Sequence, residues 1–274
     1  MMKKKLSYSI QSVRPYINWI YFYYAWGMTD KPKNEKQKLR DDAEERLDDF
    51  EKKYHTRALF GIFDANGDGD DILIERKVRI PFLRQQKPTN QGEPNLCLSD
   101  FVRPLSSGVS DQVGMFATTV EGIMETVSYG DAFEQMMTQT LADRLAEATA
   151  EKMHQEVRTT YWGYAPNEHL TMEELLHEHY QGIRPAIGYP SLPDTSINFI
   201  LSKLLGMREI GIRLTENGMM IPHASVSGFI LAHPQACYFN LGKIGEDQLK
   251  DYAQRRGVPL ELIRKFLVSS LLKK

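Results

Sequence analysis

The spacing of apolar residues along the chain predicts two long helices. The stretch 31–54 is highly charged, and its apolar residues recur at helical spacing, which is typical of a solvent-facing amphipathic helix. A longer helix is predicted from about Asp131 to Thr160. Its apolar residues form one stripe, made of Phe133, Met137, Leu141, Leu145 and Ala148. Each stripe marks the face that should pack against the rest of the protein.

Short runs of β-type residues predict an antiparallel sheet. These runs are Ala58–Phe63, Ile72–Ile80, Val113–Thr119, Ile210–Leu214, Gly228–Ala232 and Cys237–Ile244. The last two are joined by His233–Ala236, which indicates a hairpin turn. Strands and helices do not alternate regularly. This order favours an α+β fold with an antiparallel sheet over a doubly wound parallel sheet.

Three shorter helical regions are also predicted. The first covers Thr171–Tyr180 and opens with Thr171 and Glu174 in the spacing of a capping box. Another lies near Ser196–Leu205, and a charged helical region closes the chain. Between the first two lies Arg184–Pro193, which is rich in Pro and Gly and therefore cannot be a regular helix.

Composition indicates a soluble globular protein of 274 residues, with 42% hydrophobic and 26% charged residues. The formal net charge of −2 gives no overall positive field that would favour nucleic acid or an anionic membrane as a partner. The basic run Lys3–Lys5 has no apolar segment after it, so residues 1–12 are predicted to be a flexible, solvated tail. The aromatic stretch Trp19–Trp26 is too short to span a membrane. Two distant cysteines, Cys97 and Cys237, fit a reducing cytoplasm.

Two segments carry metal-like patterns that their context argues against. Asp64–Gly69, followed by Glu75, matches the ligand spacing of a calcium loop, but the flanking runs read as strands rather than helices. A polar β-hairpin turn is the favoured interpretation. In His177-Glu178-His179 the two imidazoles lie two positions apart, so on a helix they point to different faces and cannot share a metal.

The segment Arg184–Pro190 has the residue types of a rigid binding loop. Arg184 offers a fork of donors for a carboxylate, Gly188 permits close approach of a backbone, and Tyr189 offers a flat ring and a hydroxyl. These properties suit a small anionic ligand. A simple packed turn explains the same residues equally well, so residue chemistry by itself leaves the two interpretations open.

The pattern Arg-x-x-x-Gly-Tyr-Pro at 184–190 resembles the signature of the activation domain of cobalamin-dependent methionine synthase. Further segments support the resemblance along nearly the whole chain. They are Tyr16–Trp19, Asp100–Val102, Ala142–Glu147, Tyr161–Glu168, Tyr180–Ile183, Leu214–Glu216, Ala224–Gly228, Gly242–Ile244, Asp247-Gln248 and Asp251–Ala253. The resemblance implies that residues 1–274 form one C-shaped α+β domain with a twisted antiparallel sheet flanked by helices.

The resemblance also implies a function. Domains of this family hold S-adenosylmethionine in a shallow groove and dock onto a cobalamin domain. There the ligand's methyl group, with an electron from a flavodoxin-type reductant, restores methylcobalamin from inactive cob(II)alamin. The chain is therefore expected to serve as a reactivation subunit that is inactive alone.

The resemblance assigns site residues by position. Arg184 would clamp the ligand's carboxylate, and Ala186, Gly188 and Tyr189 would supply backbone and ring contacts. Glu147 matches the acid at the ammonium end of the ligand, while Tyr238 and Phe239 match an aromatic pair beside the site. Asn18 stands where the family usually has an Asp, so one negative charge near the ammonium is missing.

Two modules of a complete methionine synthase have no counterpart in this sequence. The pattern Asp-x-His-x-x-Gly, which supplies the lower ligand of cobalamin, is absent, and two cysteines cannot form a three-thiolate zinc site. Cobalamin is therefore expected only through a partner, a methionine synthase that lacks its own activation domain. The alternative is an adaptor of the same fold that docks on a corrinoid protein without productive S-adenosylmethionine binding.

Overall fold

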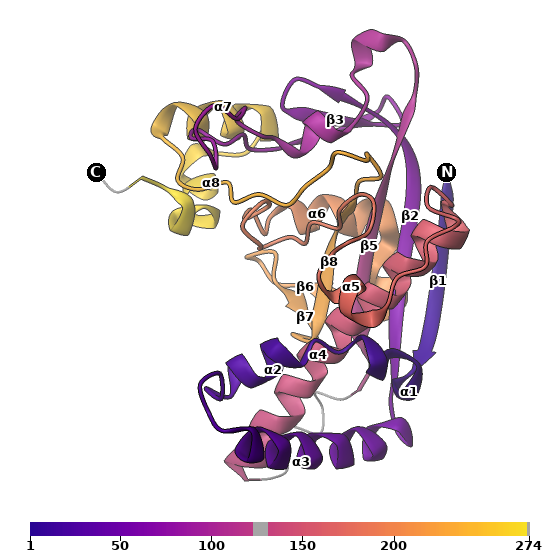
Figure 1. Cartoon of the computed structure of the whole chain (residues 1–274). Helices are drawn as coiled ribbons and strands as arrows, with labels where there is room; N and C mark the ends of the chain where they lie inside the picture. The colour runs from indigo at the N-terminus through magenta and orange to yellow at the C-terminus, as the bar shows by residue number, and fades with distance from the viewer. Residues whose placement is uncertain (123–130, 273–274) are drawn as a thin grey trace.

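A curled antiparallel sheet of six strands forms the centre of the fold (Figure 1). The computed structural model describes residues 1–122 and 131–272. The strand order is β4-β3-β2-β5-β8, and β1 pairs with β2. The strands are β1 (Met2–Ser9), β2 (His55–Asp68), β3 (Asp71–Ile74), β4 (Val78–Pro81), β5 (Asp111–Val120) and β8 (Ser225–Ile230). A separate two-stranded ribbon consists of β6 (Arg213–Leu214) and β7 (Met220–Ile221).

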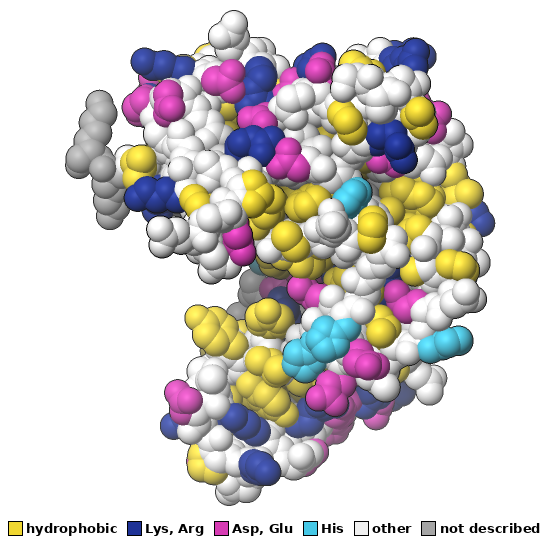
Figure 2. Space-filling model, turned by 45° about the horizontal axis from the view of Figure 1, so that its top comes forward, with side chains coloured by type: hydrophobic (Ala, Val, Ile, Leu, Met, Phe, Trp, Pro, Cys, Tyr) yellow, Lys and Arg dark blue, Asp and Glu magenta, His cyan; other side chains and the backbone are white. Residues whose placement is uncertain are grey.

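Helices flank the sheet and give the molecule a C shape, which the space-filling view shows as a notch between an upper and a lower lobe (Figure 2). They are α1 (Ile10–Val13), α2 (Trp19–Ala25), α3 (Lys33–Glu51), α4 (Ala132–Glu156), α5 (Met172–Leu176), α6 (Ile197–Leu201), α7 (Glu246–Arg256) and α8 (Leu260–Phe266). The α+β class, the antiparallel sheet and the C shape are confirmed. In the described part of the chain, no helix combines the length and apolar character needed to cross a membrane.

The N-terminal segment is a strand, so the prediction of a flexible tail over residues 1–12 is wrong. All of Met2–Ser9 pairs antiparallel with β2. Leu6 and Tyr8 pack against the hydrophobic core, while Lys3 forms an ion pair with Glu209. The lysines that suggested a solvated tail lie on the edge of the sheet, where charged side chains discourage pairing with other chains.

The apolar stripes predicted for the two long helices are mostly buried. In α3, Leu39, Ala43, Leu47 and Phe50 are buried as predicted. In α4 the stripe from Met137 onward is buried, whereas Phe133 is partly exposed and its ring lies 5.2 Å from that of Trp26. The last turn of the predicted helix, Val157–Tyr161, is π-helical.

The structure differs from three of the strand predictions and from one of the helix predictions. The run Ile72–Ile80 divides into β3 and β4, because Glu75 and Arg76 adopt left-handed backbone conformations in a tight turn. Only the last two residues of Ile210–Leu214 are a strand. The segment Cys237–Ile244 is irregular, since its backbone bonds to loops: the Leu241 N–H donates to the Pro190 carbonyl. The predicted helix Thr171–Tyr180 ends at Leu176, although its capping box is present.

Both faces of the sheet are covered. Along β2, Phe60 and Ile62 point into the core beneath α1, α3 and α4, whereas Leu59 and Phe63 point into a second core beneath α6. This alternation is the two-residue period of a strand. The central strands are therefore rigid supports for the loops at their edges.

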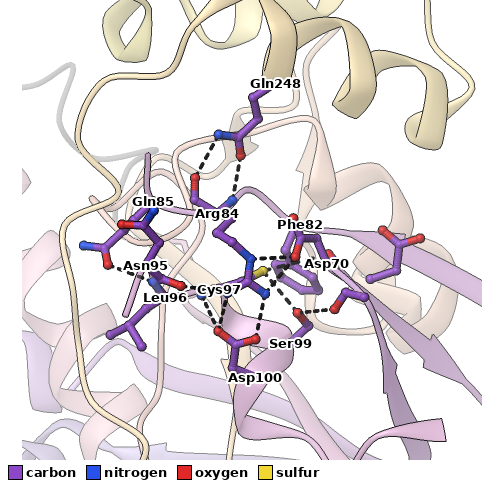
Figure 3. A network of polar contacts seen from close by, with 12 residues as sticks. Asp70, Phe82, Arg84, Gln85, Asn95, Leu96, Cys97, Ser99, Asp100 and Gln248 are labelled. Carbon is purple, nitrogen blue, oxygen red and sulfur yellow. Dashed lines mark hydrogen bonds and ion pairs between the residues drawn. The ribbon is translucent and has the colours of Figure 1, made fainter. Parts of the chain in front are cut away.

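A third, smaller hydrophobic core lies beneath α7 and α8. A network of polar contacts around Arg84 connects this region to the end of the sheet (Figure 3). The Arg84 guanidinium binds both oxygens of Asp100 at 2.7 Å and also Asp70. The side chain of Gln248, on α7, bonds the backbone N–H and carbonyl of Arg84 at 2.7 and 2.9 Å. The C-terminal helices are thus tied to the sheet by paired hydrogen bonds.

Candidate ligand-binding groove

A groove of about 670 Å³ brings together residues from distant parts of the sequence. Its walls come from α2, α4, the end of α5, the Arg184 loop and residues 238–240. The lining residues are Tyr16, Asn18, Tyr21, Tyr24, Ala25, Arg144, Glu147, Glu151, Leu176, Glu178, Arg184, Pro185, Ala186, Tyr189, Pro190, Ser191, Tyr238, Phe239 and Asn240. Of the eight predicted site residues, Gly188 does not line the groove.

The Arg184 loop is seated on the edge strand β8. The Ile183 and Leu231 backbones exchange two hydrogen bonds, and the Ile187 N–H donates to the Ser227 carbonyl at 2.9 Å. The loop cannot continue as a regular strand because Pro185 has no N–H to donate. Gly228 faces the loop so closely that a Cβ there would clash with the Pro185 backbone oxygen.

Gly188 turns the chain rather than contacting the groove. Its φ of +92° lies in a region that side chains disfavour, and its N–H donates to the Leu192 carbonyl at 2.8 Å. The turn presents Tyr189 to the groove, where the residue is 49% exposed. The glycine and tyrosine of the signature therefore act as a pair, the first bending the backbone and the second presenting a side chain.

Arg184 is the buried cation of the groove, with 6% of the residue exposed. One terminal nitrogen, Nη2, pairs with Glu151 of α4, and the guanidinium carbon lies 5.3 Å from the Phe116 ring centroid. Nε is buried without a partner. Burial alone would lower the pKa of Arg184, but the Glu151 carboxylate reverses that effect, and the net shift is upward. The guanidinium is therefore charged, fixed and only partly paired.

Tyr238 holds the backbone of the Arg184 loop. Its hydroxyl accepts from the Arg184 N–H at 2.8 Å and lies 3.3 Å from the Tyr180 hydroxyl. Beneath Tyr180, the guanidinium of Arg158 lies 4.1 Å from the ring centroid and forms two 2.7 Å hydrogen bonds with Glu168. A buried polar layer thus supports this wall of the groove. Phe239 is almost fully buried beside it.

Glu147 and Asn18 both have structural partners. Glu147 accepts a hydrogen bond from the Tyr189 hydroxyl, and burial together with the Glu147 charge raises the pKa of Tyr189. Asn18 is the N-cap of α2, where its Oδ1 accepts from the Ile20 N–H at 3.1 Å. The predicted contacts of these two residues with a ligand's ammonium group remain predictions.

Sequence reasoning missed several groove residues. Glu151 lies one helical turn after Glu147, and this spacing could have placed both carboxylates on the same face of α4. The exposed rings of Tyr21 and Tyr24 come from the aromatic stretch that was considered only as a membrane span. Glu178 was considered only as part of a metal motif.

The two metal-like segments have structural explanations. Residues 64–75 form the β2–β3 hairpin, and Asp71 binds Arg79 and Arg255 there. Beyond the end of α5, the rings of His177 and His179 lie 6.0 Å apart, and the His177 Nδ1 is 2.7 Å from the Glu173 carbonyl oxygen. The hairpin interpretation of residues 64–75 is confirmed.

Comparisons with known proteins agree with the fold and with the family that the sequence resembles. The family model described as the vitamin B12 dependent methionine synthase activation domain matches residues 9–257. The chain is also similar to a crystal structure of the MetH reactivation domain bound to AdoHcy, with a TM-score of 0.91 and 38% sequence identity. That similarity covers 100% of this chain and 91% of the other. This chain therefore belongs to the family of activation domains of vitamin B12-dependent methionine synthase.

Proposed function

We propose that the chain binds S-adenosylmethionine in the groove and supports reductive methylation of cob(II)alamin on a separate methionine synthase. The observation that carries the proposal is the arrangement around Arg184, where a buried, partly paired guanidinium lies among carboxylates and exposed tyrosines. The similar reactivation domain bound to AdoHcy supports a ligand of this chemical class.

The groove offers complementary groups for each part of such a ligand. The unpaired edge of the Arg184 guanidinium suits a carboxylate, and the acidic side chains of Glu147, Glu151 and Glu178 suit a cationic end. The rings of Tyr21 and Tyr24 supply flat, partly exposed surface for a purine.

The corrinoid and the electron come from other proteins in this proposal. Methyl transfer requires the donor carbon and the accepting cobalt to be held close and in line, because positioning carries much of the rate. The groove positions the methyl donor, and the partner synthase positions the corrinoid. A flavodoxin-type donor supplies the electron.

Calorimetry with S-adenosylmethionine tests the binding step directly. We expect one ligand per chain, and competition by S-adenosylhomocysteine at the same site. An absence of binding at millimolar ligand would contradict the proposal. It would favour the adaptor function, in which the fold docks on a corrinoid protein without holding the methyl donor.

A further inference from the structure

A buried tyrosine, Tyr180, lies behind the groove wall without lining the groove itself. It is 8% exposed, and its hydroxyl lies 3.3 Å from the hydroxyl of Tyr238, which does line the groove. Within residues 1–122 and 131–272, the Tyr180 hydroxyl has no other hydrogen-bond partner. The two hydroxyls therefore connect the protein interior to the groove wall.

The Tyr180 hydroxyl is the donor in this contact. If Tyr238 donated, the Tyr180 hydrogen would be buried without an acceptor, and an unsatisfied buried donor is costly. Burial also raises the pKa of Tyr180, which keeps its hydroxyl protonated. The Tyr238 oxygen therefore accepts twice, from the Tyr180 hydroxyl and from the Arg184 N–H at 2.8 Å. Because Tyr238 is 36% exposed, its own hydrogen can bond to solvent.

The ring of Tyr180 is fixed from two sides. The guanidinium carbon of Arg158 lies 4.1 Å from the ring centroid, and the His154 ring meets the Tyr180 ring edge-on at a centroid distance of 4.9 Å. Both neighbours are fully buried, and Arg158 is held by two hydrogen bonds to Glu168. Burial lowers the pKa of His154, so its imidazole is neutral beside Arg158. Rigid surroundings thus direct the Tyr180 hydroxyl at Tyr238.

Tyr238 connects Tyr180 to Arg184. Tyr180 lies four positions before Arg184 in the chain, but the contact runs through Tyr238, 58 positions after Tyr180. The Arg184 guanidinium is buried and pairs with Glu151, while its Nε has no partner. A small shift of the backbone displaces the end of so long a side chain, and hydrogen bonds behind a site keep its binding groups in place.

We propose that Tyr180 is a positioning residue for the groove. It donates to Tyr238, and Tyr238 in turn holds the backbone from which Arg184 reaches the ligand. The inference rests on the proposed function, in which Arg184 holds the carboxylate of S-adenosylmethionine. Tyr180 acts on that ligand only through Tyr238.

A double-mutant cycle tests this inference. The proteins are the wild type, Tyr180→Phe, Tyr238→Phe, the double variant and Tyr8→Phe. Tyr8, on β1, is a matched control because its hydroxyl also donates inside the protein, to Glu156 at 2.6 Å, and it does not line the groove. The measurements are the affinity for S-adenosylmethionine, the melting temperature, and the amide proton resonance of Arg184 in the ligand-free protein.

We expect Tyr180→Phe to weaken S-adenosylmethionine binding about threefold to tenfold, the scale of one neutral hydrogen bond. In the Tyr238→Phe background the same change should alter affinity less than about twofold, because residues that act through one another are not additive. Tyr180→Phe should shift the Arg184 amide proton upfield and speed its exchange with solvent, while lowering the melting temperature no more than Tyr8→Phe does. Tyr8→Phe should leave both the affinity and the Arg184 amide unchanged.

Three results would overturn the inference. An unchanged Arg184 amide in Tyr180→Phe would show that Tyr180 does not hold the loop. Additive losses of affinity in the cycle would show that Tyr180 does not act through Tyr238. Equal weakening of binding by Tyr8→Phe would show a general effect of stability.

Failure of the proposed function is distinguishable from these results. A wild-type protein that binds no S-adenosylmethionine at millimolar concentration would overturn the proposed function, and with it the role of Tyr180 in binding. The three results above instead leave wild-type binding intact, and the Arg184 amide is measured without any ligand.

Discussion

At the scale of single residues, Arg184 combines deep burial with incomplete pairing. Its Nη2 is bound to Glu151, but Nε has no partner, and unpaired buried donors are costly unless a ligand satisfies them. The backbone N–H of the same residue is held by Tyr238. The guanidinium is thus pre-oriented before a ligand arrives, which lowers the entropy lost on binding.

Replacing Arg184 should therefore affect binding strongly. We expect Arg184→Ala to weaken S-adenosylmethionine binding by about 1.5–3 kcal/mol, the usual scale for a lost charge-assisted hydrogen bond. Arg184→Lys should restore part of the loss, because a point charge cannot reproduce a planar fork. Calorimetry measures the affinity of each variant for S-adenosylmethionine. Unchanged affinity in both variants would place the ligand elsewhere.

The Arg184→Ala variant needs a control because it leaves Glu151 partly buried without its cation, which can destabilise the fold by itself. The double variant Arg184→Ala with Glu151→Gln removes that charge. If its melting temperature recovers while its affinity stays low, the loss of binding does not come from a destabilised fold.

Asn18 has a structural role that a carboxylate can also fill. Asp and Asn are equally good N-caps, so Asn18→Asp should keep the start of α2 while adding a negative charge to the groove. We expect tighter S-adenosylmethionine binding by about 0–1 kcal/mol, the range for partly exposed ion pairs. Asn18→Ala, which loses the cap without changing charge, is the control. A clear loss of affinity in Asn18→Asp would show a groove adapted to the amide.

At the scale of elements, the signature loop depends on the strand beside it. The loop replaces a regular strand on the edge of β8 and approaches so closely that Gly228 is required. The conformation that presents Arg184 is therefore determined jointly by Pro185 in the loop and by a glycine more than 40 positions later in the chain.

Gly228→Ala should disturb this contact. A methyl group directed at the Pro185 oxygen forces the loop away from β8, so we expect a loss of about 1–3 kcal/mol in the free energy of unfolding and weaker ligand binding. Denaturant melts and calorimetry measure the two effects. Gly257→Ala is the control, since it strains a left-handed position at the end of α7, outside the groove. Equal effects of the two variants on binding would mean that Gly228 acts only through global stability.

At the scale of the whole molecule, the proposed function assigns to the groove only one of the two reactants, the methyl donor. Its walls combine α2 and α4 with the Arg184 loop and residues 238–240, which are far apart in the sequence. In residues 1–122 and 131–272, no group of three or more potential metal ligands comes together. The open side of the groove is where the proposed partner synthase would dock.

The isolated chain is therefore expected to bind S-adenosylmethionine without transferring its methyl group to homocysteine. Adding a methionine synthase without its own activation domain, together with a low-potential reductant, should restore methylcobalamin and turnover. Absorbance of the corrinoid and methionine formation are the readouts. Recovery of oxidised synthase at the same rate without this chain would contradict the proposal, as would methylation of a small molecule by the chain alone.

Local patterns were sufficient to predict much of the fold, and the family resemblance predicted part of the groove. The stripe in α3 and most of the stripe in α4 are buried, because an amphipathic helix must cover its apolar face wherever it lies. The resemblance carried by the signature loop identified Arg184 and Tyr189, and the structure places both in the groove. The helix stripes and the loop motif each lie within a short stretch of sequence, which a sequence displays directly.

Tertiary structure alone decided the features that depend on distant contacts. Met2–Ser9 is a strand because β2 offers it an edge, and Cys237–Ile244 is irregular because its backbone bonds to loops instead of a neighbouring strand. Glu151 pairs with Arg184, and Glu178 lines the groove, because the fold packs α4 and the end of α5 against the Arg184 loop. Local spacing in the sequence does not determine these contacts. Irregular and edge segments have too few local contacts to determine their own conformation, so the rest of the fold determines it for them.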